Sequence, residues 1–317
     1  MNFTAGIDVG NYDTKTQHTT TPSSYQVDGK IRNKLADQSI FYNGLYYSPT
    51  WERNNQQTDK THNDYCLVMS LFAIGKEIVF QIKEKYPEFS NAQIQEKIDE
   101  IDSLKIGVGI PIGLLSAEAD KMKETYLNAW KDGFEFEYND FKFNLKLTKC
   151  SVFPQDLTPI LLNEELDIIN TYDDIYVFGI GGGTVDVIPC HKKMPVTEKC
   201  FSIEKGSTVM YAEIIKKIQQ EFGKTMDYTT VEKVLLNQPT VIDEARKERI
   251  KEHAKVFTDK LVDEFMHLGL SLGDYPSVFI GGGALLIKDN LMNNENFVKA
   301  EFIEDVHANA KSFAIFA

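Results

Sequence analysis

Three short apolar segments, each followed at once by glycine or other small residues, constrain the fold of this chain more than any other feature. They cover residues 3–15, 175–188 and 277–287. When the first segment is aligned with the second, Gly10 falls on Gly181, about 170 residues further along, and this period is too long for a solenoid of short repeats. We therefore expect two related halves, each with a strand that ends in a glycine-containing turn.

The second and third segments each contain three consecutive glycines, Gly181-Gly182-Gly183 and Gly281-Gly282-Gly283. Residues without a Cβ atom allow backbone N–H groups to converge on an anion, so such a loop can hold phosphate. A tight turn or a β-bulge is the alternative for either triplet taken alone. Two triplets, together with Asp8-Val9-Gly10 at the end of the first strand, favour a shared ligand cleft between the two halves.

Strand and helix signals fill the sequence between these segments, as is typical of an α/β fold. Asn43-Gly44 separates two aromatic-rich runs and predicts a β-hairpin over residues 39–47. Ser116 is expected to cap a helix over residues 117–130. Two further helices, each with one apolar stripe, are expected to end at Gly223 and Gly269. The stripes are Tyr211, Ile215, Ile218 and Phe222 in the first helix, and Ile250, Ala254, Phe257, Leu261, Phe265 and Leu268 in the second.

The charge and the cysteine content narrow the function classes. With 47 acidic and 34 basic residues the net charge is −13, which repels phosphate backbones and anionic lipid, so we expect no direct nucleic-acid or membrane binding. The amino-terminal residues lack the basic and apolar regions of a signal peptide. The four cysteines show no C-x-x-C spacing, and no H-E-x-x-H motif occurs. A reduced, cytoplasmic protein is expected.

Two other nucleotide-binding motifs are incomplete. Gly223-Lys224-Thr225 resembles the end of a P-loop, but position 218, where that motif needs its first glycine, is Ile. Gly107-x-Gly109 lacks the third glycine of a dinucleotide fingerprint, because position 112 is also Ile. Neither a P-loop enzyme nor a dinucleotide-binding enzyme is expected.

Five motifs, in the order in which they occur, resemble those of the actin superfamily, which includes actin, the heat-shock chaperone ATPases, sugar kinases and bacterial actins. Within it, residues 108–115 followed by Val152-Phe153-Pro154 are most similar to the ParM-type plasmid-segregation actins. The five motifs are the first phosphate loop at 8–15, the first connecting motif at 152–156, the second phosphate loop at 179–186, the adenosine motif at 279–286 and the second connecting helix at 308–313.

The resemblance implies a site for ATP or GTP with Mg²⁺. It implies that Asp8 holds the metal through water, that Lys15 contacts phosphate and that Gln155 positions the attacking water, so that Asp8 and Gln155 are the expected catalytic residues. Position 179 is Gly where the family has Asp, and Asp186 is a candidate to supply the missing metal-binding charge. The residues expected to contact the nucleotide are Gly10, Asn11, Thr14, Lys15, Gly181, Gly182, Gly183, Thr184, Gly281, Gly282, Gly283 and Ala284.

The resemblance also implies an actin-like, RNase H-like fold of two domains. Domain I is expected at residues 1–160, with 306–317 returning to it, and domain II at 161–305; their smaller subdomains are expected at about 30–100 and about 206–270. The expected function is a head-to-tail filament that grows with bound ATP or GTP, hydrolyses it slowly and segregates plasmid DNA through a DNA-binding adaptor. The alternatives are a nucleotide-binding scaffold with little hydrolysis, indicated by Gly179, and a small-molecule kinase of the same superfamily.

Overall fold

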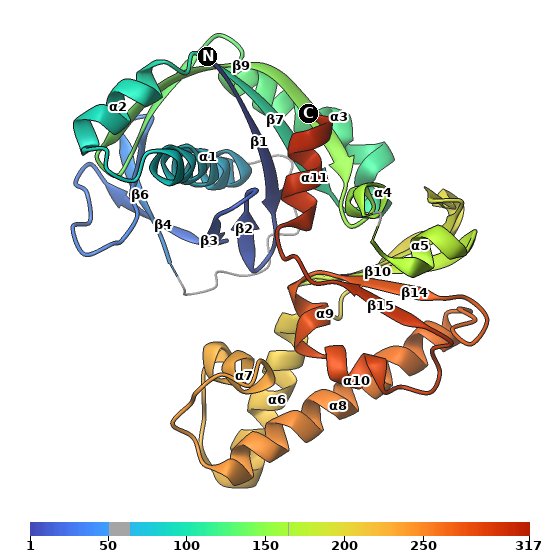
Figure 1. Ribbon diagram of the computed structural model, residues 1–317. Coiled ribbons are helices and arrows are strands. Elements are labelled where there is room, and N and C mark those ends of the chain that lie inside the picture. Colours follow the sequence, from blue (N-terminus) through green and yellow to red (C-terminus); the bar gives the residue numbers. More distant parts are fainter. Residues whose placement is uncertain (51–63, 164) are drawn as a thin grey trace. The chain divides into compact units, whose positions relative to one another are not determined.

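The computed structural model describes residues 1–50, 64–163 and 165–317. The chain divides into two compact units, residues 1–159 with 307–317 and residues 160–306. Each unit contains one sheet with helices packed around it (Figure 1). Residues 51–63, which belong to the expected smaller subdomain of domain I, lie outside the described residues.

The strands of the first unit form one mixed sheet. They are β1 (Asn2–Val9), β2 (Asp13–Lys15), β3 (Thr20–Pro22), β4 (Tyr25–Gly29), β5 (Ile40–Tyr42), β6 (Leu45–Pro49), β7 (Ser103–Ile110), β8 (Phe134–Tyr138) and β9 (Phe141–Pro154). Their order among the described residues is β3-β2-β1-β7-β9-β8-β5-β6-β4. The central strands β1, β7 and β9 run parallel, and β1 and β7 end in unbroken buried runs, as expected for strands covered on both faces. In the β8–β9 hairpin, buried aromatic and aliphatic residues alternate with more exposed polar ones.

The helices of the first unit include one long, apolar helix. They are α1 (Asp64–Lys85), α2 (Asn91–Asp99), α3 (Leu115–Trp130) and α11 (Ala308–Phe316), and a 3₁₀ turn, Ile112–Leu114, precedes α3. The prediction that Ser116 caps its helix is wrong: α3 begins at Leu115 and Leu114 is in the N-cap position. The 3₁₀ turn runs directly into α3, so the helix starts without a side-chain cap.

Among the described helices, α1 alone is long and apolar enough to cross a membrane. Of its most apolar 18-residue window, 78% is buried inside the protein. Such burial is what the core helix of a globular unit requires, and it accounts for the apolar composition of α1.

Helix α11 lies directly on the central strands β1 and β7 (Figure 1). A Cβ atom on Gly6 would lie 1.7 Å from the carbonyl oxygen of Ala310, and one on Gly107 would lie 2.3 Å from the carbonyl oxygen of Phe313. Only glycine permits so close an approach of two backbones. The Gly107-x-Gly109 pair, which does not complete a dinucleotide motif, therefore has a packing role: it admits a helix to the face of the sheet.

The second unit has a smaller mixed sheet. Its strands are β10 (Asp174–Ile180), β11 (Val185–His191), β12 (Met194–Pro195), β13 (Phe201–Ile203), β14 (Ser277–Ile280) and β15 (Ala300–Ile303). Their order among the described residues is β12-β11-β10-β14-β15, with β13 paired to β11. Strands β10 and β11 form an antiparallel hairpin around Gly181–Thr184, whereas β10, β14 and β15 run parallel.

Two helices of the second unit end where the sequence predicts. Gly223 ends α6 with φ 65° and Gly269 follows α8 with φ 91°, so both predictions are confirmed. The α6 stripe is partly wrong, because Ile214 is buried in place of Ile215 and Phe222 is 37% exposed. The remaining helices are α4 (Thr158–Leu162), where the chain passes from the first unit to the second, α5 (Asp167–Thr171), α6 (Ser207–Phe222), α7 (Tyr228–Leu235), α8 (Glu244–His267), α9 (Gly282–Leu286), α10 (Lys288–Met292) and a 3₁₀ turn, Thr197–Lys199.

Candidate functional site

The turn after β1 brings two of the predicted residues together. The backbone N–H of Gly10 donates to the carbonyl oxygens of Asp8 and Asp13, both at 3.1 Å, and closes the turn that leads into β2. Asp8 and Lys15 are direct partners in the antiparallel β1–β2 ladder. Partners of this kind point to the same face of a sheet, so a carboxylate and an ammonium group lie on one face of this turn.

Asp8 is 9% exposed as a residue, and its carboxylate is held by two side-chain amides. Gln155 Nε2 donates to its Oδ1 at 2.6 Å, and Asn309 Nδ2 donates to its Oδ2 at 3.3 Å. Gln155 directly follows β9, which reaches Asp8 because β9 pairs with β7 and β7 pairs with β1. The two residues predicted to be catalytic are therefore in contact, although 147 positions separate them.

Asn309 and Asp156 belong to the same cluster, and neither was among the predicted site residues. Asn309, in the first turn of α11, donates from Nδ2 to Asp156 Oδ1 at 2.9 Å. Its Oδ1 accepts the backbone N–H of Asp156 at 2.8 Å. Asp156 lies in the first predicted connecting motif and Asn309 in the second, so the motifs gave a signal for each residue separately. Their contact was not predictable in this way, because it joins segments that are 153 positions apart.

The other predicted residues of this loop differ in what they offer to a ligand. Thr14 is 1% exposed and its hydroxyl pairs with that of Ser23 at 2.9 Å, so this hydroxyl is already used within the protein. Lys15 and Asn11 are half-buried, and none of the residues that the structure describes pairs with their side chains. Lys15 is therefore a cation beside Asp8 that a bound anion can approach.

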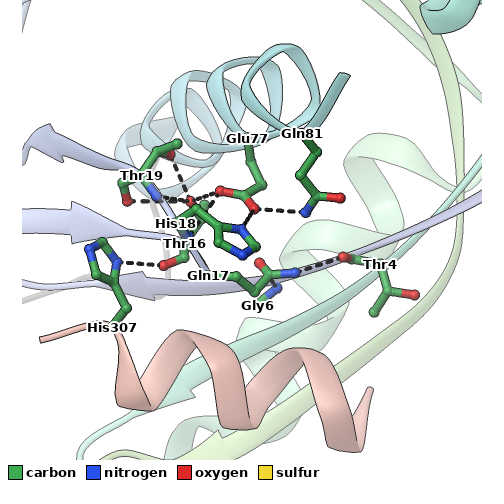
Figure 2. Close-up of polar contacts among 9 residues, drawn as sticks. All are labelled: Thr4, Gly6, Thr16, Gln17, His18, Thr19, Glu77, Gln81 and His307. Atoms are coloured by element: carbon green, nitrogen blue, oxygen red, sulfur yellow. Dashed lines mark hydrogen bonds and ion pairs between the residues drawn. The ribbon is translucent and has the colours of Figure 1, made fainter. Parts of the chain in front are cut away.

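A buried carboxylate holds the loop that follows β2 (Figure 2). Glu77 of α1 is fully buried and accepts from Thr16 Oγ1 at 2.5 Å, from the backbone N–H of His18 at 3.2 Å and from Gln81 Nε2 at 2.8 Å. His307 Nδ1 contacts the carbonyl oxygen of Thr16 at 2.8 Å. The segment that begins α11 therefore contacts both the loop beyond Lys15 and, through Asn309, the Asp8 carboxylate.

The glycine loop of the second unit is shaped by the start of α6. The carbonyl oxygens of Gly181, Gly182 and Gly183 accept N–H groups from Ser207, Thr208 and Gly206, respectively, at 2.9–3.1 Å. Thr208 Oγ1 adds a bond to the carbonyl oxygen of Gly182 at 2.7 Å. Within the described residues, no acceptor pairs with the N–H of Gly182 or Gly183. With the carbonyl groups used by α6, these N–H groups are the part of the loop left for an anion.

Asp186 lies directly across the β10–β11 hairpin from Gly179. Its carboxylate is 5% exposed and accepts a hydrogen bond from Ser202 Oγ on β13. Because partners across antiparallel strands share a face, this carboxylate is on the side to which a residue at position 179 would point. The described residues contain no group of three or more histidine, cysteine or acidic side chains that could hold a metal ion by themselves.

The third glycine segment forms a sharp turn from β14 into α9. Gly281 has φ 99°, in the region that favours glycine, and its carbonyl oxygen accepts the N–H of Ala284 at 3.1 Å. Gly282 has open space where a Cβ would be, so its backbone can be approached closely. Ala284 is fully buried, and its side chain is part of the core rather than of an open surface.

The cysteines do not form a reactive site. Burial raises the pKa of Cys66 to about 11 and the pKa of both Cys150 and Cys190 to about 12. Cys200 is partly buried, and its desolvation raises its pKa to about 11. Thiols with these pKa values are protonated at neutral pH and are poor nucleophiles and metal ligands.

Comparison with known proteins places this geometry in a known fold. Residues 177–293 match the family model of the C-terminal domain of archaeal MreB-like actin homologues. The structure superimposes on the archaeal actin homologue Ta0583 with a TM-score of 0.73 at 18% identity, covering 99% of this chain and 98% of that one. No curated protein sequence matches the chain.

Two ParM structures are similar over the same length. The apo ParM protein of pSK41 has a TM-score of 0.65 at 15% identity, covering 99% of this chain and 96% of that one. A 15-stranded ParM filament from Clostridium botulinum has a TM-score of 0.68 at 18% identity, covering 100% and 99%. The α/β actin-like fold and the resemblance to the actin superfamily are thereby confirmed. The chain is an actin-like protein by fold, and its residues 177–293 are similar to the C-terminal domain of the archaeal MreB-like actin homologues.

Proposed function

We propose that this protein binds ATP or GTP with Mg²⁺ and assembles head to tail into a filament whose stability depends on hydrolysis of the nucleotide. The observation that supports nucleotide binding best is the loop of Gly181–Thr184, where α6 takes up the glycine carbonyl groups and leaves the N–H groups of Gly182 and Gly183 to an anion. The archaeal homologue Ta0583 has been solved in complex with ADP.

In this proposal the two phosphate loops contact the phosphates through backbone N–H groups and through Lys15. Gln155, whose Nε2 is bound to Asp8, would orient the attacking water through its Oε1. The segment around Gly281–Ala284 would approach the base and the sugar, with Gly282 giving the closest access. Asn11 and Thr14 belong to the first loop, but the Thr14 hydroxyl must leave Ser23 before it can contact a ligand.

The residues present fit a magnesium ion that arrives with the nucleotide. Mg²⁺ in nucleotide sites is held by one or two carboxylates, by phosphate oxygens and by water, rather than by a cage of protein ligands. Asp8 and Asp186 are nearly buried carboxylates, each next to a phosphate loop, and each already accepts a hydrogen bond that orients it. When bound, the ion would neutralise charge on the phosphates; Asp8 and Asp186 would hold it.

Filament formation is proposed from the structural neighbours. Solved structures similar to this chain include an Alp12 filament, an AlfA filament bound to AMPPNP and the ParM filament from Clostridium botulinum. A head-to-tail contact that does not close on itself generates such a polymer from one kind of subunit. We propose further that the filament moves plasmid DNA through a separate basic adaptor, since a chain with net charge −13 is poorly suited to contact DNA itself.

One observation favours a second candidate, a nucleotide-binding scaffold with little hydrolysis. Position 179 is Gly, so β10 provides no carboxylate beside the second phosphate loop, and Asp186 is the acidic group facing that side of the hairpin. If Asp186 does not replace the missing charge, nucleotide binding and assembly would persist while hydrolysis would be slow.

Light scattering and phosphate release, recorded in parallel with Mg²⁺ and either ATP, GTP or a non-hydrolysable analogue, test the proposal. Scattering that rises with nucleotide and falls as phosphate appears supports a dynamic filament; a lasting rise without phosphate supports the scaffold. Lys15→Ala is expected to weaken nucleotide binding about 10-fold or more. The matched control Lys224→Ala replaces an exposed lysine with no partner among the described residues and should behave as wild type. No nucleotide binding at any protein concentration would refute the proposal.

Plasmid segregation needs a separate test in cells. An unstable plasmid that carries this gene with its flanking genes should be retained, and Asp8→Ala should raise its loss rate to that of the empty plasmid. Equal retention by wild type and Asp8→Ala would rule out this role while leaving filament formation in place.

A further inference from the structure

The side-chain amide of Asn309 uses both of its ends within the cluster around Asp8. Its Oδ1 accepts the backbone N–H of Asp156 at 2.8 Å, while its Nδ2 donates to Asp156 Oδ1 at 2.9 Å and to Asp8 Oδ2 at 3.3 Å. One residue of α11 is thus bonded both to the Asp8 carboxylate near the end of β1 and to the residue directly after Gln155.

The bonds from Asn309 hold Asp156 in an uncommon backbone conformation. Asp156 has φ 63°, a left-handed conformation that residues other than glycine adopt at an energetic cost and that Asp and Asn tolerate best. The paired bonds from Asn309 stabilise this conformation. Asp156 directly follows Gln155, and the N–H of Leu157 donates to the carbonyl oxygen of Gln155 at 2.8 Å, so the same conformation closes the tight turn that begins at Gln155.

The position of Asn309 is fixed by the sheet beneath it. Gly6 and Gly107 allow the α11 backbone to rest on β1 and β7, and His307, in the N-cap position of α11, contacts the carbonyl oxygen of Thr16 at 2.8 Å. A rigid element therefore presents the Asn309 amide, which is the requirement for a side chain that positions another.

We propose that Asn309 is a positioning residue for Gln155 and Asp8. The inference depends on the proposed nucleotide hydrolysis for its consequence, but not for its geometry. With Nε2 of Gln155 bound to Asp8 Oδ1, the Oε1 atom of Gln155 is the end left to orient a water, and no described residue donates to it. Asn309 keeps this arrangement by holding the second oxygen of Asp8 and the backbone that follows Gln155.

The chemistry of the cluster accounts for asparagine at this position. The site requires an acceptor for the Asp156 N–H and a donor for two carboxylates, and only a side-chain amide of this length provides both. An aspartate here would place a third carboxylate beside Asp8 and Asp156 and would offer no donor when ionised. A glutamine would be one methylene longer than the space that the bonds define.

The first measurement is made without nucleotide. In protein labelled with ¹⁵N only at glutamine, the side-chain amide signal of Gln155, assigned by its loss in Gln155→Ala, should shift or broaden in Asn309→Ala. The matched control is Ser312→Ala, which removes hydrogen bonds to Thr158 and to the carbonyl oxygen of Asn309 but leaves the Asn309 amide and its bonds to Asp8 and Asp156 in place. It should leave the Gln155 signal unchanged. An unchanged signal in Asn309→Ala would overturn the proposal.

The second measurement is single-turnover phosphate release with Mg²⁺ and ATP or GTP. Asn309→Ala should slow release about 10- to 100-fold while the nucleotide Kd stays within about threefold of wild type. Asp156→Asn, which preserves the acceptor and tolerates the left-handed backbone, should keep most of the rate, and Asp156→Ala should not. In a protein that already carries Gln155→Ala, adding Asn309→Ala should slow phosphate release by less than about a further twofold. Equal rates for Asn309→Ala and wild type, or a full additive loss in that background, would refute the proposal.

The two proposals fail in different ways. If wild type binds no nucleotide or releases no phosphate, the proposed function is wrong, and the Gln155 signal still decides whether Asn309 positions that side chain. If wild type hydrolyses nucleotide and the Gln155 side-chain signal is the same in wild type and in Asn309→Ala, only the positioning role is wrong.

Discussion

Nδ1 of His18 lies 2.5 Å from Oε1 of Glu77, a carboxylate that is fully buried, while the His18 side chain itself is 46% exposed. The second oxygen of Glu77 accepts from Thr16 Oγ1 and from the His18 backbone N–H. The loop that joins β2 to β3 is therefore attached to α1 by one acidic side chain (Figure 2). Lys15, the last residue of β2, directly precedes this loop.

We expect Glu77→Gln to destabilise the protein. An amide has one acceptor oxygen where the carboxylate has two, and its NH₂ would face the Thr16 and His18 donors, so buried donors would lose their acceptor. The expected loss in the free energy of unfolding is about 2–4 kcal/mol. Urea unfolding followed by circular dichroism measures it. Glu84→Gln, an exposed position on the same helix, is the control and should change stability by less than about 0.5 kcal/mol.

Gly6→Ala should displace α11 from the sheet. Its Cβ would fall 1.7 Å from the carbonyl oxygen of Ala310, a backbone atom that cannot move alone. We expect a loss of about 3 kcal/mol or more and, through Asn309, slower phosphate release. Gly273→Ala is the control, because its Cβ would meet only an ordinary contact at 3.9 Å. Similar stability of the two variants would contradict the close contact between α11 and β1.

The ion pair between Glu221 of α6 and Arg249 of α8 should stabilise the protein less in acid. Two hydrogen bonds from the Arg249 guanidinium, at 2.7 and 2.8 Å, lower the pKa of Glu221 to about 2 from its ordinary value of 4.5. A carboxyl whose pKa is depressed in the folded state stabilises the protein fully above about pH 4.5 and loses this effect as the pH falls toward about 2.

The thermal midpoint of Glu221→Gln, compared with wild type from pH 7 down to pH 2, measures this effect. The variant should be less stable at pH 7, and the difference should shrink below about pH 4.5. Glu213→Gln, also on α6 and exposed, should show no such convergence. A difference in thermal midpoint between Glu221→Gln and wild type that stays constant from pH 7 to pH 2 would refute the lowered pKa of Glu221.

Gly179→Asp tests whether the missing carboxylate limits hydrolysis. The new side chain would face Asp186 across paired strands, so without nucleotide and Mg²⁺ the variant should be less stable by about 1 kcal/mol through repulsion. With both present it should regain stability and release phosphate about 10-fold faster. Gly179→Asn controls for size without charge. If the two variants match in stability and in rate, position 179 does not face the phosphates.

The parts of the fold that follow from local chemistry were predictable from the sequence. Asn43 and Gly44 both have positive φ in the turn between β5 and β6, as their side chains allow, so the predicted hairpin is confirmed. Gly223 and Gly269 end helices for the same reason. Ser116 misled the prediction because the 3₁₀ turn before α3 provides the helix start, and no local pattern distinguishes a serine in a cap from one inside the first turn.

The parts of the candidate site that depend on distant segments were predictable only in outline. Asp8 and Gln155 could be named from motifs, but Asn309 and Asp156 could not, since their bond depends on where β9 and α11 meet on the sheet. Glu77 was hidden in the apolar helix α1, and two of its partners, Thr16 and His18, are 61 and 59 positions away in the sequence. The roles of the predicted site residues remain predictions for the experiments above.

Residues 307–317 complete a unit whose other members are residues 1–159, and this order has a consequence for synthesis. A chain is made from its amino terminus and tends to fold as it emerges, so every residue of the second unit is made before Asn309 exists. The unit that emerges first is therefore finished last. A chain interrupted after the second phosphate loop but before α11 lacks the helix that packs on the β1 and β7 glycines and the amide that holds the second oxygen of Asp8, so only a chain that includes α11 forms the intact cluster.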